Sequence, residues 1–320
     1  MEPLLRLEGL TKTYTIRSAW GRKGRRLKAV DGVDLAIMPG EIVGLVGESG
    51  CGKSTLGKLV LRLEDPTSGR ILYKGEDITA WPENRMRSLR RQMQLIFQDP
   101  YSSLNPRQDV FHTVAEPFII HRICNNKTEL AERVSAILKD VGLGEDQLYR
   151  YPHEFSGGQR QRIGIARALA LHPEFIVADE PVSALDVSIQ AQVVNLLLDL
   201  KNKFNLTYLF IAHDLQVVQY LSTRIAVMYL GKIVEVFDKD LLGQVPHHPY
   251  TEALLAAAPY PDPNRRRKRV VLEGDPPSPL NTPPGCPFHP RCSYHREICT
   301  TDRPLWHEAG QRQWLSCHVR

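Results

Sequence analysis

Long apolar segments are missing from this chain of 320 residues. No run approaches the roughly 20 consecutive apolar residues that a helix needs to cross a bilayer, which argues against a membrane-spanning protein. The first residues, MEPLLRLEGLTKTY, carry charges too early and too often for a signal peptide. With 42% hydrophobic and 24% charged residues, the composition is that of a globular protein, and we expect it to be cytoplasmic.

A strong charge of one sign is lacking as well. The net charge is +5, and part of it comes from two basic clusters, RKGRRLK at residues 22–28 and RRRKR at residues 265–269. Aromatic residues do not alternate with the basic ones in either cluster, whereas single-stranded nucleic acids are bound through aromatic stacking as well as charge. We therefore expect no nucleic acid partner. The clusters fit solvated loops or a surface that faces anionic lipid headgroups.

Cysteine is scarce in most of the chain but concentrated near its end. Four of the six cysteines fall within the last 35 residues, with the spacing C-x₅-C-x₆-C-x₁₇-C. They are Cys286, Cys292, Cys299 and Cys317. The C-x₂-C pairs of zinc ribbons and bacterial ferredoxins are absent, so the spacing leaves metal binding and free thiols equally open. A reducing compartment favours metal over disulfide, and His289, His295 and His318 are further candidate zinc ligands.

The order of the apolar runs predicts an α/β fold. Short alternating runs in residues 4–45 are typical of strands. QLIFQDP is a further short strand, and FIVADEP and YLFIAHD are continuous apolar strands that suit a parallel sheet covered on both faces. Helical periodicity covers residues 54–63, 128–142 and 189–204.

Proline marks a change in the last quarter of the chain. It becomes frequent from Pro246 onward, which predicts an extended, poorly helical tail. We expect the boundary near Asp238, so that residues 1–238 form one domain and residues 239–320 form a separate C-terminal region.

A phosphate-binding motif, GESGCGKS, occupies residues 47–54 and fits G-x-x-x-x-G-K-[ST] without departure. A predicted strand precedes it and a predicted helix follows, which is the context that makes the motif credible. In such a loop the backbone N–H groups cradle the phosphates, the Lys53 ammonium reaches the β- and γ-oxygens, and the Ser54 hydroxyl ligates Mg²⁺. The expected nucleotide contacts are Gly47, Ser49, Gly50, Cys51, Gly52, Lys53, Ser54 and Thr55.

Polar residues end the predicted strands at the edge where a parallel sheet binds ligands. Asp179 ends an apolar strand and can hold Mg²⁺ through water. Glu180 points elsewhere and can polarise an attacking water as the catalytic base. His213 closes the next strand, and we expect it to sense the γ-phosphate. Gln98, at the end of LIFQ, is a candidate for contact with Mg²⁺ or the attacking water.

A second anion-binding motif follows much later in the chain. In HEFSGGQRQRIGIARAL, residues 153–169, a glycine pair precedes an Arg-rich helical stretch, so free N–H groups meet the positive end of a helix dipole. One chain cannot wrap both ends of a nucleotide with two cradles on separate lobes.

The order GESGCGKS, Q, SGGQ, FIVADEP, SALD, H resembles the ATP-binding cassette family over roughly residues 4–238. The resemblance implies a P-loop NTPase (RecA-like) core, an antiparallel β subdomain, a helical subdomain at about residues 99–165, and a small irregular Cys-rich C-terminal region. It implies head-to-tail pairing of two cassettes, adenine stacking on Tyr14, and cross-dimer communication through SALD, which ends at Asp186. The residues that would cap the γ-phosphate in the partner's site are Ser156, Gly157, Gly158 and Gln159.

The C-terminal part of the sequence indicates a particular group within this family. HHPYTEALLAAAP and EGDPPSPLNTPPGCPFHPRC look like the C-terminal region of cassettes from dipeptide and oligopeptide importers, and nickel and glutathione importers are similar. This implies an ATP-hydrolysing motor, peripheral at the cytoplasmic face of the inner membrane. Its partners would be a second, paralogous cassette, two permease subunits that dock near FQDPYSSLNP, and an extracytoplasmic binding protein. A soluble cassette ATPase of repair, translation or iron–sulfur assembly is the rival.

The same resemblance bears on the four late cysteines. Similar cysteines in this importer group are implied to hold a [4Fe–4S] cluster, and zinc is the alternative. We expect a cluster to stabilise the C-terminal region, which is too poor in apolar residues to fold well alone. We also expect it to lie away from the ATP site.

Overall fold

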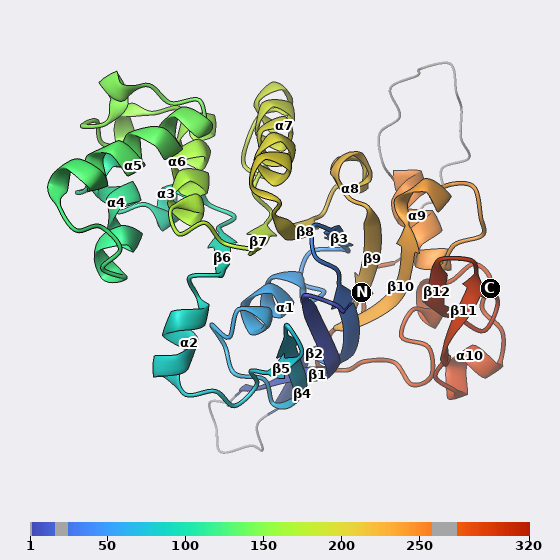
Figure 1. Cartoon of the computed structure of the whole chain (residues 1–320). Coiled ribbons are helices and arrows are strands. Elements are labelled where there is room, and N and C mark those ends of the chain that lie inside the picture. Colours follow the sequence, from blue (N-terminus) through green and yellow to red (C-terminus); the bar gives the residue numbers. More distant parts are fainter. Residues whose placement is uncertain (1, 17–24, 258–273) are drawn as a thin grey trace. The chain divides into compact units, whose positions relative to one another are not determined.

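The computed structural model describes residues 2–16, 25–257 and 274–320 (Figure 1). The chain forms two compact units, a first unit made of Met1–Ala80 with Ala212–Arg320 and a second unit made of Trp81–Ile211. Within the described ranges, no helix is both long enough and apolar enough to cross a membrane. The basic cluster at residues 265–269 lies outside the described residues, as do residues 22–24 of the other cluster.

A four-stranded antiparallel sheet forms the N-terminal part of the first unit. Its strands lie in the order β2–β1–β4–β5. Alternation along β1 buries Leu5 and Leu7 on one face, as expected for a strand with one covered face. This sheet is the antiparallel β subdomain that the resemblance implied. Its members are β1 (Leu5–Ile16), β2 (Arg25–Ile37), β4 (Ser68–Tyr73) and β5 (Glu76–Asp77).

A second sheet of the first unit carries the strand before the phosphate-binding motif. That strand, β3, is buried along its whole length and pairs in parallel with β9. Antiparallel pairing then continues through β10 and β12 to β11. A Cβ on Gly44 of β3 would lie 2.1 Å from Val218 Cγ1, so glycine lets α8 pack closely on this strand. The elements are β3 (Ile42–Val46), α1 (Lys53–Val60), α8 (Leu215–Leu221), β9 (Arg224–Tyr229), β10 (Lys232–Asp238), β11 (Trp306–Gly310) and β12 (Gln313–Ser316).

The C-terminal region is more regular than the sequence predicted. The expectation of an extended, poorly helical tail is wrong for α9 and for the β11–β12 hairpin. Strand β12 pairs with β10 and buries Leu315 and Gln313. The C-terminal region therefore extends an existing sheet and does not form a separate core. The short elements here are 3-10 helices at Lys239–Leu241 and His289–Arg291, with α9 (Pro249–Ala257) and α10 (Ile298–Thr301).

A buried carboxylate fixes this region to the sheet. Glu235 of β10 is fully buried, and its oxygens lie 2.8 Å from His247 Nδ1 and accept hydrogen bonds from His248 N (3.0 Å) and Gln313 Nε2 (2.8 Å). The Thr251 hydroxyl donates to it as well. Several donors on one buried carboxylate offset the cost of removing its charge from water. Glu235 thereby holds the start of α9 against β10 and β12.

The second unit contains three parallel strands in the order β6–β7–β8. Every residue of β7 and β8 is buried, which is typical of parallel strands covered on both faces. Helices α3 to α6 contact one another and form the helical part, close to the range that the resemblance implied. In α5, Val134, Ile137 and Leu138 are buried, as the helical periodicity predicted. The elements are α2 (Glu83–Leu89), β6 (Met93–Ile96), α3 (Pro100–Ser103), α4 (Val110–Ile120), α5 (Lys127–Asp140), 3-10 helices Glu145–Gln147 and Pro152–Glu154, α6 (Gly157–Leu169), β7 (Phe175–Asp179), α7 (Val187–Phe204) and β8 (Thr207–Ala212).

Candidate nucleotide-binding site

The GESGCGKS segment forms the loop between β3 and α1, in the strand–loop–helix context that the sequence predicted. Gly52 takes the N-cap position of α1 with φ 111°, and in the described part of the chain no side chain caps this helix. Its first N–H groups are therefore oriented as in helix N-termini that bind phosphate. A Cβ on Gly52 would lie 2.1 Å from Ala29 O, and one on Gly47 would lie 2.2 Å from Met228 O. Both positions require glycine because the loop runs against the backbone of β2 and β9.

Lys53 lies inside this loop. Its side chain is buried, and Nζ donates hydrogen bonds to Gly47 O (2.8 Å) and Glu48 O (3.1 Å). Cys51 N donates to Glu48 O (3.3 Å), and Gly231 N, from the β9–β10 turn, donates to Cys51 O (2.8 Å). Burial raises the pKa of the Cys51 thiol. The loop is thus closed on itself around the lysine ammonium, which supplies the positive charge that phosphate oxygens require.

Tyr14, predicted to stack on adenine, lies on β1. Its hydroxyl donates to a carboxylate oxygen of Glu64, and Lys12 Nζ lies 5.1 Å from the centre of its ring. Burial, followed by the hydrogen bond to Glu64, raises the pKa of Tyr14 to about 12. A side-chain interaction with Thr55, in the first turn of α1, lowers the pKa of Tyr14 and partly opposes this rise. Tyr14 therefore borders the helix that follows the phosphate loop, and its stacking role stays a prediction.

Glu180 occupies a special backbone position in the second unit. It follows Asp179, the buried last residue of β7, and adopts φ 43°, which a residue with a side chain rarely does. Its N–H donates to Ile211 O of β8 at 2.9 Å, which holds the unusual backbone in place. Gln98 Nε2 donates to Glu180 Oε2 at 3.0 Å. Two of the predicted catalytic residues are therefore in direct contact.

The SGGQ motif forms the N-terminus of α6. Ser156 is its N-cap residue, and Ser156 Oγ accepts from Gln159 N at 3.4 Å while Gln159 Oε1 accepts from Ser156 N at 3.0 Å. This reciprocal pair is a capping box. Ser156 is exposed to solvent, so the positive end of this helix dipole lies at the surface of the second unit.

The two glycines of this motif pack against the segment that follows β7. A Cβ on Gly158 would lie 2.4 Å from Ile189 Cγ2, and one on Gly157 would lie 3.2 Å from Leu185 Cδ2. Leu185 belongs to SALD, and Ile189 lies in the first turn of α7, whose N-cap is Asp186. Asp186 accepts from Ile189 N at 3.0 Å and from Ser188 Oγ at 2.7 Å, and these bonds lower its pKa. The SGGQ and SALD motifs are therefore in contact, which the sequence did not predict.

The predicted site residues divide between the two units. The second unit carries Gln98, the Asp179–Glu180 pair, SGGQ and SALD. His213 directly follows β8, is exposed and lies in the first unit. The first unit also carries the other predicted contacts, Tyr14 and the residues of the phosphate loop from Gly47 to Thr55.

The segment predicted to meet membrane subunits contains two exposed aromatic side chains. Phe97 is 45% exposed and Tyr101 is 67% exposed, although large aromatic side chains are usually buried. The guanidinium of Arg167 lies 5.6 Å from the Phe97 ring centre, and that of Arg160 lies 5.3 Å from the Tyr101 ring centre. Both arginines belong to α6, so the exposed rings lie beside the helix that begins with SGGQ.

The four late cysteines lie near one another in the first unit. Cys286 N donates to Cys299 O at 2.9 Å. Burial raises the pKa of Cys286 to about 11, and the other three thiols add to the rise. Among the described residues, however, no group of three or more His, Cys, Asp or Glu side chains is arranged to hold a metal ion. The structure contains neighbouring thiols rather than an assembled metal centre.

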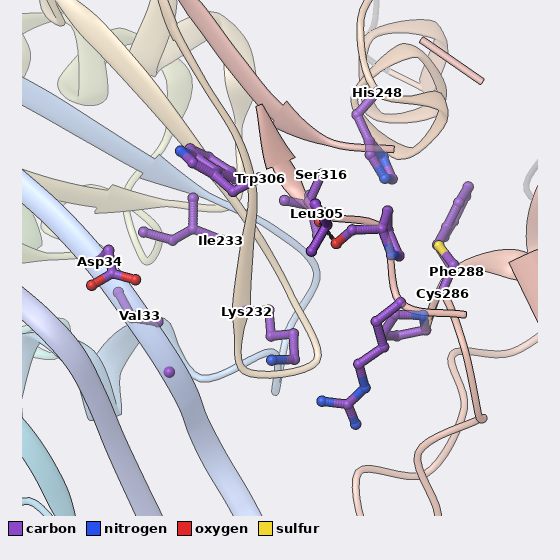
Figure 2. Close-up of a pocket in the computed structure, with 15 residues that line it drawn as sticks. Val33, Asp34, Lys232, Ile233, His248, Cys286, Phe288, Leu305, Trp306 and Ser316 are labelled. Atoms are coloured by element: carbon purple, nitrogen blue, oxygen red, sulfur yellow. Dashed lines mark hydrogen bonds between the residues drawn. The ribbon is translucent and has the colours of Figure 1, made fainter. Parts of the chain in front are cut away.

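A cavity of about 260 Å³ borders one of these thiols (Figure 2). Val33 of β2 and Ile233 of β10 line one side, and Cys286, Phe288 and Trp306 of the C-terminal region also line it. None of the described residues that line this cavity is a predicted nucleotide contact. The cavity is therefore distinct from the phosphate-loop site.

The expectation that the cysteine region lies away from the ATP site is wrong. Arg291, the residue before Cys292, donates two hydrogen bonds to Glu48 of the phosphate loop, from its two terminal nitrogens at 2.7 and 2.9 Å. The fold of the tail around β12 brings a segment 243 residues away in the sequence to this loop. No periodicity or motif in the sequence signals such a contact.

Two family models match the chain. One, described as ABC transporter, matches residues 30–183. The other, described as oligopeptide/dipeptide transporter, C-terminal region, matches residues 234–299. The first match contains the phosphate loop, SGGQ and the Asp179–Glu180 pair, and the second contains the start of α9 and three of the four late cysteines.

Curated relatives match almost the whole chain. The oligopeptide transport ATP-binding protein AppF of Bacillus subtilis is 51% identical over 99% of this chain and 98% of its own length. A putative oligopeptide transport ATP-binding protein, YkfD, of the same organism is 52% identical over 93% of this chain and 91% of its own length. A putative peptide import ATP-binding protein of Brucella ovis is 52% identical over 98% of this chain and 97% of its own length.

Solved structures share the fold. A dimeric structure of the ATP-binding cassette MJ0796 bound to ADP and Pi is 30% identical, with a TM-score of 0.66 over 73% of this chain and 98% of that one. CbiO1 of Clostridium perfringens, part of an ABC transporter complex, is 25% identical, with a TM-score of 0.65 over 76% of this chain and 92% of that one. The fold and the two motifs define an ATP-binding cassette of the P-loop NTPase class. The chain belongs to the ABC transporter family, as an ATP-binding subunit.

The contact between Gly158 and Ile189 gives a direct test of why SGGQ needs its second glycine. Gly158→Ala places a methyl group against Ile189, whose branched side chain is stiff, and we expect a destabilisation of about 1–3 kcal/mol. Chemical denaturation followed by circular dichroism measures it. Combining Gly158→Ala with Ile189→Ala should cost less than the sum of the two single changes, because the smaller residue removes the overlap.

Gly164 of the same helix is the matched control. In the described structure no atom beyond the neighbouring backbone of its own helix lies within 4 Å of the position of its Cβ, so Gly164→Ala should be neutral or stabilise the helix by about 0.5–1 kcal/mol. Equal effects of Gly158→Ala and Gly164→Ala would contradict the packing argument.

Proposed function

We propose that this chain is the ATP-hydrolysing motor subunit of an ABC importer for di- and oligopeptides. The observation that carries the proposal is a single chain that joins the phosphate loop at residues 47–54 to a C-terminal region of the oligopeptide/dipeptide type at residues 234–299. The ATPase part ends near Asp238, and residues 239–320 form the transporter-type region. The names of the relatives point to the same substrate class.

In this proposal the motor works with two permease subunits and an extracytoplasmic binding protein, peripheral to the cytoplasmic face of the inner membrane. The exposed rings of Phe97 and Tyr101 are the proposed surface that meets the permeases. Nickel or glutathione import by the same motor, or a soluble cassette in repair, translation or iron–sulfur assembly, is the alternative. Co-purification with integral membrane subunits separates a transporter motor from a soluble cassette.

The residue roles follow from the chemistry of the side chains. ATP bound with Mg²⁺ supplies the phosphoanhydride bond that is cleaved. Lys53 neutralises the β- and γ-phosphate oxygens, while Ser54, Asp179 and Gln98 hold Mg²⁺ directly or through water. Glu180 accepts a proton from the attacking water, and His213 contacts the γ-phosphate. The hydrogen bond from Gln98 orients the Glu180 carboxylate.

Glu180→Gln tests the catalytic assignment. Glutamine keeps the shape of the side chain but cannot accept the proton, so hydrolysis should fall by about 10²–10⁴-fold while ATP binding is retained. Phosphate release measures the rate, and equilibrium titration with ATP measures the affinity. Glu174→Gln, an exposed residue just before the other end of β7, is the control and should hydrolyse ATP at the normal rate. Near-normal turnover of Glu180→Gln would exclude Glu180 as the base.

We also propose that two cassettes pair head to tail, so that SGGQ of one subunit caps the nucleotide on the phosphate loop of the other. The N-terminus of α6 supports this, because its N-cap residue Ser156 is exposed to solvent at the positive end of the helix dipole. A cassette of the same fold, MJ0796, has been solved as a dimer. The second cassette is a paralogue or another copy of this chain.

A mixture of two inactive variants tests this arrangement. Lys53→Ala damages the phosphate loop of one chain, and Ser156→Arg blocks the SGGQ of the other. In a head-to-tail dimer one of the two sites then combines an intact loop with an intact SGGQ, so mixing should restore hydrolysis. A chain that carries both changes, mixed with an excess of either single variant, is the control and should restore none. If the wild-type chain is active as a homodimer and mixing the single variants restores no activity, the two motifs do not act in trans.

The four late cysteines are the proposed ligands of a [4Fe–4S] cluster, with zinc as the alternative metal. Four thiols in one neighbourhood match the number that a cubane cluster needs. The cavity beside Cys286 leaves room for its side chain to turn. Since the thiols as they stand do not form a metal-holding group, assembly requires such reorientation.

Metal analysis of anaerobically purified protein decides between these states. About four irons per chain with matching sulfide, lost in Cys292→Ser, support the cluster. Cys124→Ser, distant from the group in sequence, is the control and should retain the metal. One zinc without iron makes the region a zinc module. Metal-free protein with titratable thiols excludes both metals.

A further inference from the structure

Glu48 is a phosphate-loop residue for which the motif itself demands no particular side chain. In this chain both of its carboxylate oxygens are bound by Arg291, in a two-pronged ion pair with nitrogen–oxygen distances of 2.7 and 2.9 Å. The Arg291 side chain is only 5% exposed, and that of Glu48 is 26% exposed. Such a planar, doubly bonded and largely buried pair fixes geometry far better than an exposed salt bridge does.

The same residue is also held through its backbone. Glu48 N donates to the hydroxyl of Tyr250 at 2.7 Å, and Tyr250 is fully buried. The Tyr250 ring packs against Tyr229 and Phe288, with ring centres 4.7 and 5.4 Å away. Two segments of the C-terminal region, α9 and the 3-10 helix His289–Arg291, therefore bind one residue of the loop from both its backbone and its side chain.

Glu48 in turn determines the path of the loop. Its carbonyl oxygen accepts from Cys51 N at 3.3 Å and from Lys53 Nζ at 3.1 Å. A shift of Glu48 would thus move both the turn before α1 and the lysine ammonium. Tyr250 is itself anchored, because Glu235 holds the first turn of α9 and His248 Nδ1 accepts from Tyr250 N at 3.1 Å. Burial lowers the pKa of His248 to about 4, which keeps this acceptor neutral.

We propose that Arg291 and Tyr250 are positioning residues of the nucleotide site: they hold Glu48 so that the phosphate loop keeps the geometry that binds ATP. The proposal rests on ATP binding at this loop, as proposed above. It makes the C-terminal region a structural part of the ATP site rather than an appendage. Both residues act through Glu48 rather than through the predicted catalytic residues, so their loss should weaken binding while the chemical step proceeds at its normal rate once ATP is bound.

The experiment compares Arg291→Gln, Arg291→Lys, Glu48→Gln and Tyr250→Phe with the wild-type chain. Arg291→Gln and Glu48→Gln should each raise the Kd and KM for MgATP on the order of tenfold, with kcat within about twofold. Combining them should cost little more than one alone, because the same interaction is lost. Arg291→Lys keeps the positive charge but cannot donate two parallel hydrogen bonds to Glu48, so this variant should bind MgATP with intermediate affinity. Tyr250→Phe removes one hydroxyl and should raise Kd by a smaller factor.

Arg312→Gln is the matched control. Arg312 also joins the C-terminal region to the core sheet, through a 2.8 Å hydrogen bond to Asp238, but its side chain is 54% exposed, and Asp238 lies on β10 rather than in the phosphate loop. Its removal should leave Kd unchanged. Thermal unfolding of each variant shows whether it is folded. Should Arg291→Gln fail to fold, Glu48→Gln, which changes the less buried partner of the pair, gives the same test.

An unchanged Kd in folded Arg291→Gln and Glu48→Gln overturns the proposal, as do strictly additive effects of the two changes or an equal effect of Arg312→Gln. A loss of kcat at unchanged KM overturns it as well, because it places the residues in the chemical step. Wild-type protein that binds no MgATP overturns the proposed function and this inference with it. Wild-type binding with unaffected variants overturns the inference alone.

Discussion

The ion pair between Arg291 and Glu48 constrains the phosphate loop, which is the part of the first unit that the proposed ATP chemistry depends on. A phosphate loop works through the positions of its backbone N–H groups, and these positions follow from what holds the loop. Here the loop is packed between the backbones of β2 and β9 at its glycines and is tied to the C-terminal region at Glu48. The buried Glu235 carboxylate supports that region in turn. Polar groups far apart in the sequence thus stabilise one anion-binding loop.

The second unit organises its polar residues in a different way. Strand β7 ends at Asp179, and Glu180 follows it with a left-handed backbone that is held by Ile211 O and a carboxylate that is held by Gln98. Close packing of Gly158 on Ile189 joins the start of α6 to the start of α7. SGGQ therefore packs against SALD and the first turn of α7.

Local signals explain what the sequence predicted correctly. The phosphate loop, the strands before it and at β7 and β8, and α5 follow from motif context and periodicity. The helix predicted at residues 54–63 runs from Lys53 to Val60, because Arg62 adopts φ 51° and ends it. The tail was predicted wrongly because proline content hides that β12 completes an existing sheet. Likewise Arg291–Glu48 and Gly158–Ile189 join distant segments, and a single sequence carries no signal for such contacts.

Hydrogen exchange of the phosphate loop tests most directly whether the C-terminal region maintains its geometry. Amide exchange of residues 44–60, followed by mass spectrometry in the absence of nucleotide, should be faster in Arg291→Gln than in the wild-type chain, since release of Glu48 loosens the loop. Residues 187–204, which form α7 in the other unit, should exchange equally in both proteins. Equal exchange of residues 44–60 in the two proteins would contradict the claim that this ion pair holds the ATP-binding loop.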